Sequence, residues 1–277
     1  MPDPILAAVF ALVVGLCVGS FLNVVIHRLP KMLERGWKAQ CAELNGETPL
    51  VELTYNLVVP RSACPACGQQ ITAWQNIPVV SWLMLRGRCA GCRTPISIRY
   101  PLVEVLGALV AVSAIGRFGV TPAGIAACVL LWSLLALTMI DFDTQLLPDN
   151  ITLPLMWLGL IVNIGGTFAS LPNAVIGAVA GYLSLWTIYW LFKLIRGKEG
   201  MGYGDFKLLA ALGAWLGWQV LPVIVLLSSV VGAAIGITLM VFKGRDHSIP
   251  MAFGPYLAIA GALALFFGSN LVKVFFA

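Results

Sequence analysis

The stretch Gly200-Met201-Gly202-Tyr203-Gly204-Asp205-Phe206-Lys207 combines three glycines with one carboxylate immediately before a long apolar segment. No charged residue occurs in the 35 residues from Leu208 to Phe242, and this is too long for one straight membrane span. Pro222 is a natural break, so the segment predicts two spans, the first of them short. A carboxylate at the edge of a span is energetically costly, and glycines permit close backbone approach, so Asp205 is predicted to have a function.

The composition of the whole chain supports a membrane protein. Of 277 residues, 60% are hydrophobic and only 10% are charged, with a mean hydropathy of +0.92. This is far more apolar than a soluble domain. The apolar run at residues 5–26 has no basic segment before it and no clear cleavage site after it, so it predicts a first span and not a signal peptide. The net charge of +5 gives no reason to expect a nucleic-acid partner.

The fold class predicted is all-α and polytopic, with about eight transmembrane helices. The expected spans are residues 4–27, 101–117, 122–140, 151–169, 174–193, 206–220, 223–242 and 251–272. With eight spans, 15 of the 17 Lys and Arg residues fall on one side, and only Arg117 and Lys273 fall on the other. The positive-inside rule therefore predicts that the basic side faces the cytoplasm and that both termini lie outside.

Three regions follow from this topology: the span at 1–27, a polar cytoplasmic domain at 28–100, and a transmembrane domain at 101–277 that carries Asp141 and Asp205. The polar domain contains two C-x2-C pairs, Cys64/Cys67 and Cys89/Cys92, separated by 21 residues. Four thiolates in two such turns are typical of a closed structural zinc site, with Gly68 and Gly91 expected in the turns. Disulfides or a redox pair are the alternatives, but a reducing cytoplasm disfavours disulfides.

Several carboxylates are candidates for chemistry beside Asp205. Asp141 and Asp143 end the third predicted span, and two membrane crossings separate them from Asp205, so all three are expected at the cytoplasmic face. Two adjacent carboxylates can share one proton and activate water, but spacing alone does not choose between Asp141 and Asp143. Asp149 or Asn150 is expected to be the N-cap of the fourth span, and this is the main interpretation of Asp149. Glu104 is interpreted as structural, either paired with a basic residue or lying at the interface.

Other catalytic motifs receive little support. The two histidines, His27 and His247, do not form H-E-x-x-H, which disfavours a zinc protease of that class. The glycines of 200–204 lack the G-x-G-x-x-G spacing and follow a membrane span, which disfavours dinucleotide binding.

These residues resemble the bacterial type IV prepilin peptidases, which are intramembrane aspartic proteases of the GxGD type. The resemblance rests on the N-terminal stretch 19–30 (GSFLNVVIHRLP), the paired C-x2-C module, Ile140-Asp141 followed by Leu147-Pro148-Asp149, and Gly202-Tyr203-Gly204-Asp205. It implies that Asp141 and Asp205 are the catalytic pair. It also implies cleavage of the basic leader of type IV prepilins and type II secretion pseudopilins, after a glycine and usually before a phenylalanine, at the cytoplasmic face of the inner membrane. N-methylation of the new N-terminus with S-adenosylmethionine is implied as well, although no residue here locates the methyl donor.

Two other functions compete with this interpretation. An ion-coupled transporter would use intramembrane carboxylates as a relay, but its broken helices would meet near the bilayer midplane, whereas the carboxylates here gather at one face. A membrane scaffold would dock a partner through the zinc module and use Asp141 and Asp205 only as caps.

Overall fold

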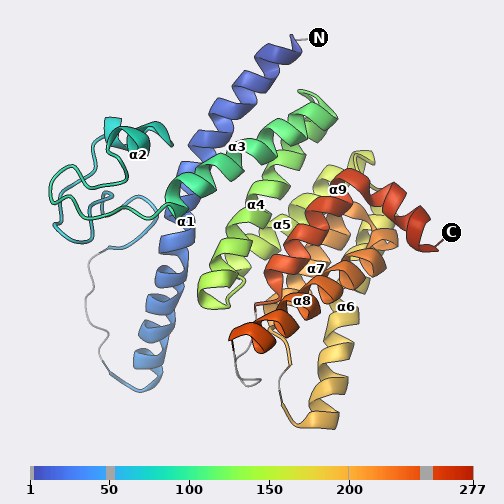
Figure 1. The fold of residues 1–277 in the computed structure, drawn as a ribbon. Coiled ribbons are helices and arrows are strands. Elements are labelled where there is room, and N and C mark those ends of the chain that lie inside the picture. Colours follow the sequence, from blue (N-terminus) through green and yellow to red (C-terminus); the bar gives the residue numbers. More distant parts are fainter. Residues whose placement is uncertain (1–2, 48–53, 199, 244–251, 277) are drawn as a thin grey trace. The chain divides into compact units, whose positions relative to one another are not determined.

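The computed structural model describes residues 3–47, 54–198, 200–243 and 252–276, which are drawn as coloured ribbon in Figure 1. Over these ranges the regular elements are helices, and strand-like pairing is limited to two isolated bridges, Ala63 with Gln70 and Arg88 with Pro95. The long helices are α1 (Pro4–Leu44), α3 (Arg99–Phe118), α4 (Pro122–Thr144), α5 (Asp149–Val162), α6 (Leu171–Arg196), α7 (Tyr203–Leu216), α8 (Leu221–Lys243) and α9 (Gly254–Phe276). The short ones are η1 (Trp74–Asn76), α2 (Val80–Met84), η2 (Asn163–Gly165) and η3 (Trp218–Val220).

This architecture confirms an all-helical chain with several membrane spans. Five segments of the described chain are long and apolar enough to cross a bilayer: α1, α3, α4, α6 and the segment Trp218–Phe242, which contains most of α8. Helices α5 and α7 have 14 residues each, which is short for a straight span. A polytopic membrane protein is thus supported, while the number of eight spans stays a prediction.

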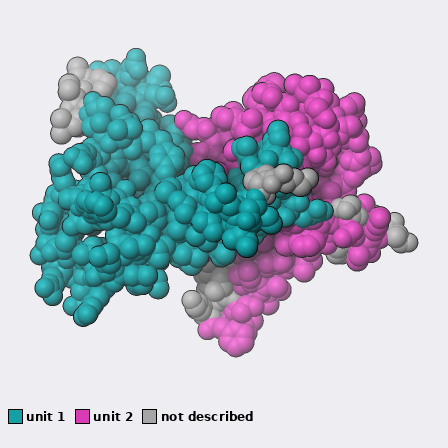
Figure 2. All heavy atoms as spheres, turned by 90° about the horizontal axis from the view of Figure 1, so that it is seen from above, with its two compact units in different colours: residues 1–128 teal, residues 129–277 magenta. Residues whose placement is uncertain are grey.

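The chain divides into two compact units, residues 1–128 and residues 129–277, which Figure 2 colours separately.

In the first unit, α1 and α3 cross at small residues. A Cβ added to Gly15 would lie 2.6 Å from the Cα of Ala108, and one added to Gly19 would lie 2.6 Å from the Cα of Glu104. The two backbones therefore touch, as in membrane helix pairs built on small residues.

Helix α1 continues well beyond the predicted end of the first span and includes Pro30 before it ends at Leu44. The region between α1 and α3 holds η1, α2 and the four cysteines, and we call residues 54–98 the cysteine module. The proposed boundary at residue 28 therefore lies inside a continuous helix.

Helix α7 forms the core of the second unit. Almost all of its residues from Asp205 to Trp215 are buried, whereas α6 and α8 expose many apolar side chains. It packs closely on α6 because Gly177 and Gly213 face each other: a Cβ on either would overlap the carbonyl group of the other. The small residues of α7 thus set how closely its neighbours approach.

The far end of α7 is fixed by a buried amide. The Asn163 side chain, at the end of α5, donates to the carbonyl oxygens of Ala214 and Trp215 at 2.9 and 2.8 Å. Helix α7 then ends at Gly217, whose φ of +84° is a conformation that side chains disfavour. The predicted break in the long apolar segment is confirmed, but it occurs at Gly217, and Pro222 lies inside the first turn of α8.

Candidate active site and metal centre

Asp141 and Asp205 lie in the second unit, near the end of α4 and in the first turn of α7. They are almost fully buried, with 4% and 6% of their surfaces exposed. The backbone N–H of Gly254, at the start of α9, donates to Oδ2 of Asp141 at 3.0 Å. Oδ1 of Asp205 is buried and has no hydrogen-bond partner among the described residues. Asp205 lies in the first turn of α7 and Asp141 accepts from the start of α9, and both of these helix starts contact Leu147.

Leu147 connects the elements that carry these carboxylates. A Cβ added to Gly204 would lie 2.6 Å from the Cβ of Leu147, and one added to Gly254 would lie 3.1 Å from both of its methyl carbons. The same Cβ on Gly254 would lie 2.6 Å from Oδ2 of Asp141. The loop after α4, the start of α7 and the start of α9 therefore meet at one leucine, and two glycines provide the room for it.

The other acidic residues near the end of α4 have different environments. Asp143 is exposed, whereas Asp141 is buried, so the two candidates that the sequence left open differ in the structure. Asp149 is the first residue of α5, and the position before it, Pro148, makes no side-chain cap bond. The N-cap interpretation of Asp149 is therefore wrong. Its carboxylate instead forms an ion pair with Lys207, whose Nζ lies 2.7 Å from both oxygens.

Aromatic side chains support the first turn of α7. Tyr203, inside the GxGD motif, packs against Tyr189 and Phe206 with ring centroids 5.1 and 5.5 Å apart. The hydroxyl of Tyr203 donates to that of the buried Tyr189 at 3.3 Å, and Lys193 donates to the same oxygen at 3.2 Å. No sequence motif indicates this cluster, because Tyr189 and Lys193 lie on α6, outside the GxGD stretch.

The four cysteines of the module form a compact cluster. Their Sγ atoms all lie within 4.8 Å of one another. The Sγ atoms of Cys64 and Cys92 are 3.8 Å apart, and those of Cys67 and Cys89 are 4.0 Å apart. A tetrahedral zinc with Zn–S bonds of ~2.3 Å separates its sulfurs by ~3.8 Å, so the cluster fits this ion.

The two C-x2-C turns repeat the same backbone pattern. The N–H groups of Cys64 and Cys89 donate to the carbonyls five residues later, those of Gln69 and Thr94. The left-handed residue that follows each second cysteine is Gly68 in one turn and Arg93 in the other, with φ of +72° and +61°. The expectation for Gly68 is confirmed, whereas the left-handed position of the second turn belongs to Arg93 and not to Gly91.

Hydrogen bonds favour thiolates at two of these cysteines. The Thr94 hydroxyl and backbone N–H lower the pKa of Cys92 to about 6, and backbone N–H groups of Cys67 and Ala66 lower the pKa of Cys64. The pKa of Cys67 rises to about 11 despite the lowering effect of the Gln69 N–H, because crowded thiols cannot all ionise easily. A divalent cation would relieve this crowding.

Glu104 is buried in the first unit, and its contacts among the described residues are neutral donors and not the basic partner that one interpretation expected. Its Oε2 accepts the backbone N–H of Val79 at 2.7 Å, and its carboxylate also bonds the side chain of Ser20. It therefore connects the start of α2 to the crossing of α1 and α3.

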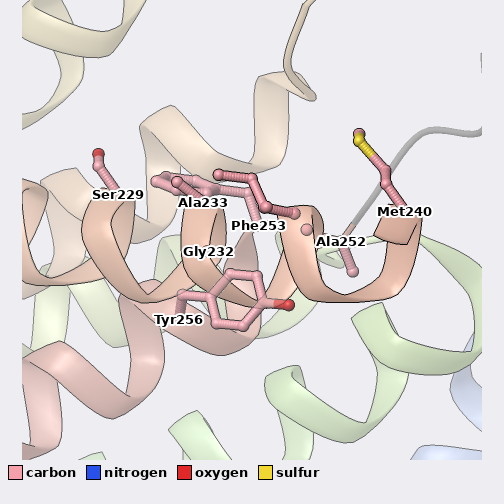
Figure 3. Close-up of a pocket in the computed structure, with 9 residues that line it drawn as sticks. Ser229, Gly232, Ala233, Met240, Ala252, Phe253 and Tyr256 are labelled. Atoms are coloured by element: carbon pink, nitrogen blue, oxygen red, sulfur yellow. The ribbon is translucent and has the colours of Figure 1, made fainter. Parts of the chain in front are cut away.

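A pocket of about 380 Å³ lies between α8 and the start of α9 (Figure 3). The close-up shows Phe253 and Tyr256 against a face of α8 that is formed by small residues, among them Gly232 and Ala233. Among the described residues, the lining contains no charged side chain, so this part of the pocket does not suit the amino and carboxylate groups of S-adenosylmethionine.

Comparison with known proteins identifies the family. The profile described as "Bacterial Peptidase A24 N-terminal domain" matches residues 13–118, and that described as "Type IV leader peptidase family" matches residues 128–237. Three similar proteins carry the name prepilin leader peptidase/N-methyltransferase. That of Pseudomonas aeruginosa is 54% identical over 98% of this chain and 94% of its own length. Those of Aeromonas hydrophila and Burkholderia pseudomallei strain 1026b are 59% and 57% identical over 94% of this chain and 90% and 85% of their own lengths. No solved structure matches significantly. The chain belongs to the type IV leader peptidase family.

Proposed function

We propose that this chain removes the leader peptide of type IV prepilins at a bacterial membrane and then N-methylates the new N-terminal residue. The structural observation that supports peptidase activity is the buried pair of Asp141 and Asp205, which come from α4 and α7. The names of the similar proteins support both activities, and their coverage of almost the whole chain supports the same domain organisation. The methyl transfer depends on those names alone.

The two aspartates would act together on water. Two neighbouring carboxylates in a buried site share one proton, so one can serve as general base and the other as general acid. The base takes a proton from the water that attacks the scissile carbonyl, and the acid protonates the leaving amine when the tetrahedral intermediate collapses. The unpartnered Oδ1 of Asp205 is available for the water or for the substrate amide. A buried polar atom without a partner is uncommon in a folded protein, which supports a role in catalysis.

The site would face the cytoplasm. Eight spans put most basic residues on the side that also carries Asp141 and Asp205, and a basic leader would stay on that side by the same rule. Alkaline phosphatase fused after residue 198 should be inactive, because that reporter folds only outside the cytoplasm. An active fusion would contradict this topology. We further propose that Cys64, Cys67, Cys89 and Cys92 hold a structural zinc in a domain of residues 28–100.

The central test compares three aspartates on the same assay. Purified Asp141→Asn and Asp205→Asn variants, incubated with a prepilin in detergent or nanodiscs, should lose leader removal, because each removes a partner from the acid–base pair. Asp143→Asn is the matched control, since Asp143 lies on the same helix and is exposed. Full activity of either the Asp141 or the Asp205 variant would exclude the assigned pair.

A further inference from the structure

The cysteine module exposes a cluster of apolar side chains. In α2, Val80, Leu83 and Met84 are 49%, 62% and 79% exposed. Their spacing of i, i+3 and i+4 places them on one face of the helix. Trp74, in the adjacent η1, is 81% exposed. We call these four residues the α2 face. An exposed apolar cluster of this kind marks an interaction surface.

Contacts inside the first unit fix the depth of this face relative to the spans. The N–H of Val79, directly before α2, donates to Glu104. Glu104 lies five residues into α3, and its backbone contacts Gly19 of α1. Gly19 precedes Arg28, the first basic residue of α1, by nine residues, or about 13 Å along the helix. The start of α2 therefore lies level with the membrane-spanning parts of α1 and α3, and not beyond them.

The charge of the module suits an anionic membrane surface. Residues 54–98 contain no Asp or Glu and four arginines, at positions 61, 86, 88 and 93. Four thiolates around one Zn²⁺ would carry a charge of −2, so the segment stays positive with the metal bound. Basic residues beside exposed aromatic and aliphatic side chains are typical of segments that lie in the headgroup region.

We propose that the α2 face inserts into the bilayer leaflet beside the cysteine module, and that the arginines of the module contact anionic headgroups. Lipid then covers the apolar side chains that the protein leaves exposed, and Trp74 lies at the interface that tryptophan prefers. The Glu104–Val79 hydrogen bond keeps α2 at this depth. The module is in consequence a membrane-embedded domain and not a freely solvated one. This inference needs only the spans α1 and α3, so it is independent of the peptidase activity.

The test uses full-length protein in nanodiscs of phosphatidylcholine with or without phosphatidylglycerol. The photoreactive p-benzoyl-phenylalanine replaces Met84 in one variant and Gln40 in another. Gln40 is an exposed control on α1, twelve residues beyond Arg28. After irradiation, mass spectrometry should find lipid adducts at position 84 in at least tenfold excess over position 40.

A second measurement follows the adduct yield as the anionic lipid content and the charge of the module are changed. The adduct yield at position 84 should rise with phosphatidylglycerol, and replacing Arg86 and Arg88 by glutamine should remove this rise. Retained prepilin cleavage by the labelled protein would show that it is folded. Equal lipid adducts at positions 84 and 40, or adducts at position 84 that are mostly with protein, would overturn the proposal. Loss of prepilin cleavage in the Asp141 and Asp205 variants bears on the proposed function and would leave the proposal for the α2 face unchanged.

Discussion

Replacing Gly254 by alanine tests whether the start of α9 positions Asp141, the proposed catalytic carboxylate. The new Cβ would lie 2.6 Å from Oδ2 of Asp141, and an ordinary contact between carbon and oxygen needs ~3.3 Å. The carboxylate or the helix start must therefore move by about 0.7 Å. Movement toward Leu147 is blocked, because the same Cβ already lies 3.1 Å from its methyl groups and Leu147 in turn packs on Gly204.

A misplacement of about 1 Å in a catalytic group can lower the rate by a factor of ~100. We expect Gly254→Ala to lower kcat/KM for leader removal by a factor of about 10 to 100, which corresponds to ~1.4–2.7 kcal/mol of transition-state stabilisation. Since alanine keeps the backbone N–H that Asp141 accepts, the loss would be due to displacement and not to a missing hydrogen bond.

The assay follows leader removal from a prepilin by mass spectrometry, with equal amounts of folded enzyme. Gly165→Ala is the matched control, because a Cβ at Gly165 would meet no atom within 4 Å. The control should keep the wild-type rate. A Gly254→Ala enzyme with the wild-type kcat/KM would refute the argument that this contact positions Asp141.

Two further predictions concern the ion pair and the metal. Lys207→Met should lower kcat/KM by about two- to fivefold, because a partly exposed pair contributes ~0.5–1 kcal/mol to the packing of α7 on α5. In a double-mutant cycle with Asp149→Asn, the two losses should not add. Strictly additive losses would show that the pair does not couple the helices. Wild-type protein should contain one zinc per chain by elemental analysis, and Cys64→Ser should lose most of it and unfold its module at a lower temperature. Wild-type protein without bound metal would exclude the zinc site.

The sequence predicts the helices well because their apolar segments are long. Each of the eight expected spans overlaps one apolar helix, although several boundaries differ. The first helix continues to Leu44 because a polar sequence can extend a helix that is already formed. The break in the long apolar segment was expected at Pro222, but proline is tolerated in the first turn of a helix. Gly217 breaks the chain instead, since its positive φ ends α7.

The site was predictable only where its chemistry is local. Asp141 and Asp205 were identified from span ends and motifs, and the turns around the cysteines from their spacing. The N–H that Asp141 accepts comes from Gly254, 113 residues away, and no local pattern indicates such a contact. For Asp149, the capping rule favoured a local hydrogen bond, but an ion pair with Lys207, 58 residues away, formed instead. Tertiary contacts of this kind outweigh capping preferences.

Packing around Leu147 and backbone N–H groups together position the two carboxylates. Leu147 fills the space that Gly204 and Gly254 leave open, so the elements that carry Asp141 and Asp205 meet at an apolar side chain. One backbone N–H reaches Asp141, and Oδ1 of Asp205 has no partner among the described residues. Because Gly204 and Gly254 give room to Leu147 and to Asp141, we expect these glycines to tolerate substitution less well than the exposed acidic residues nearby.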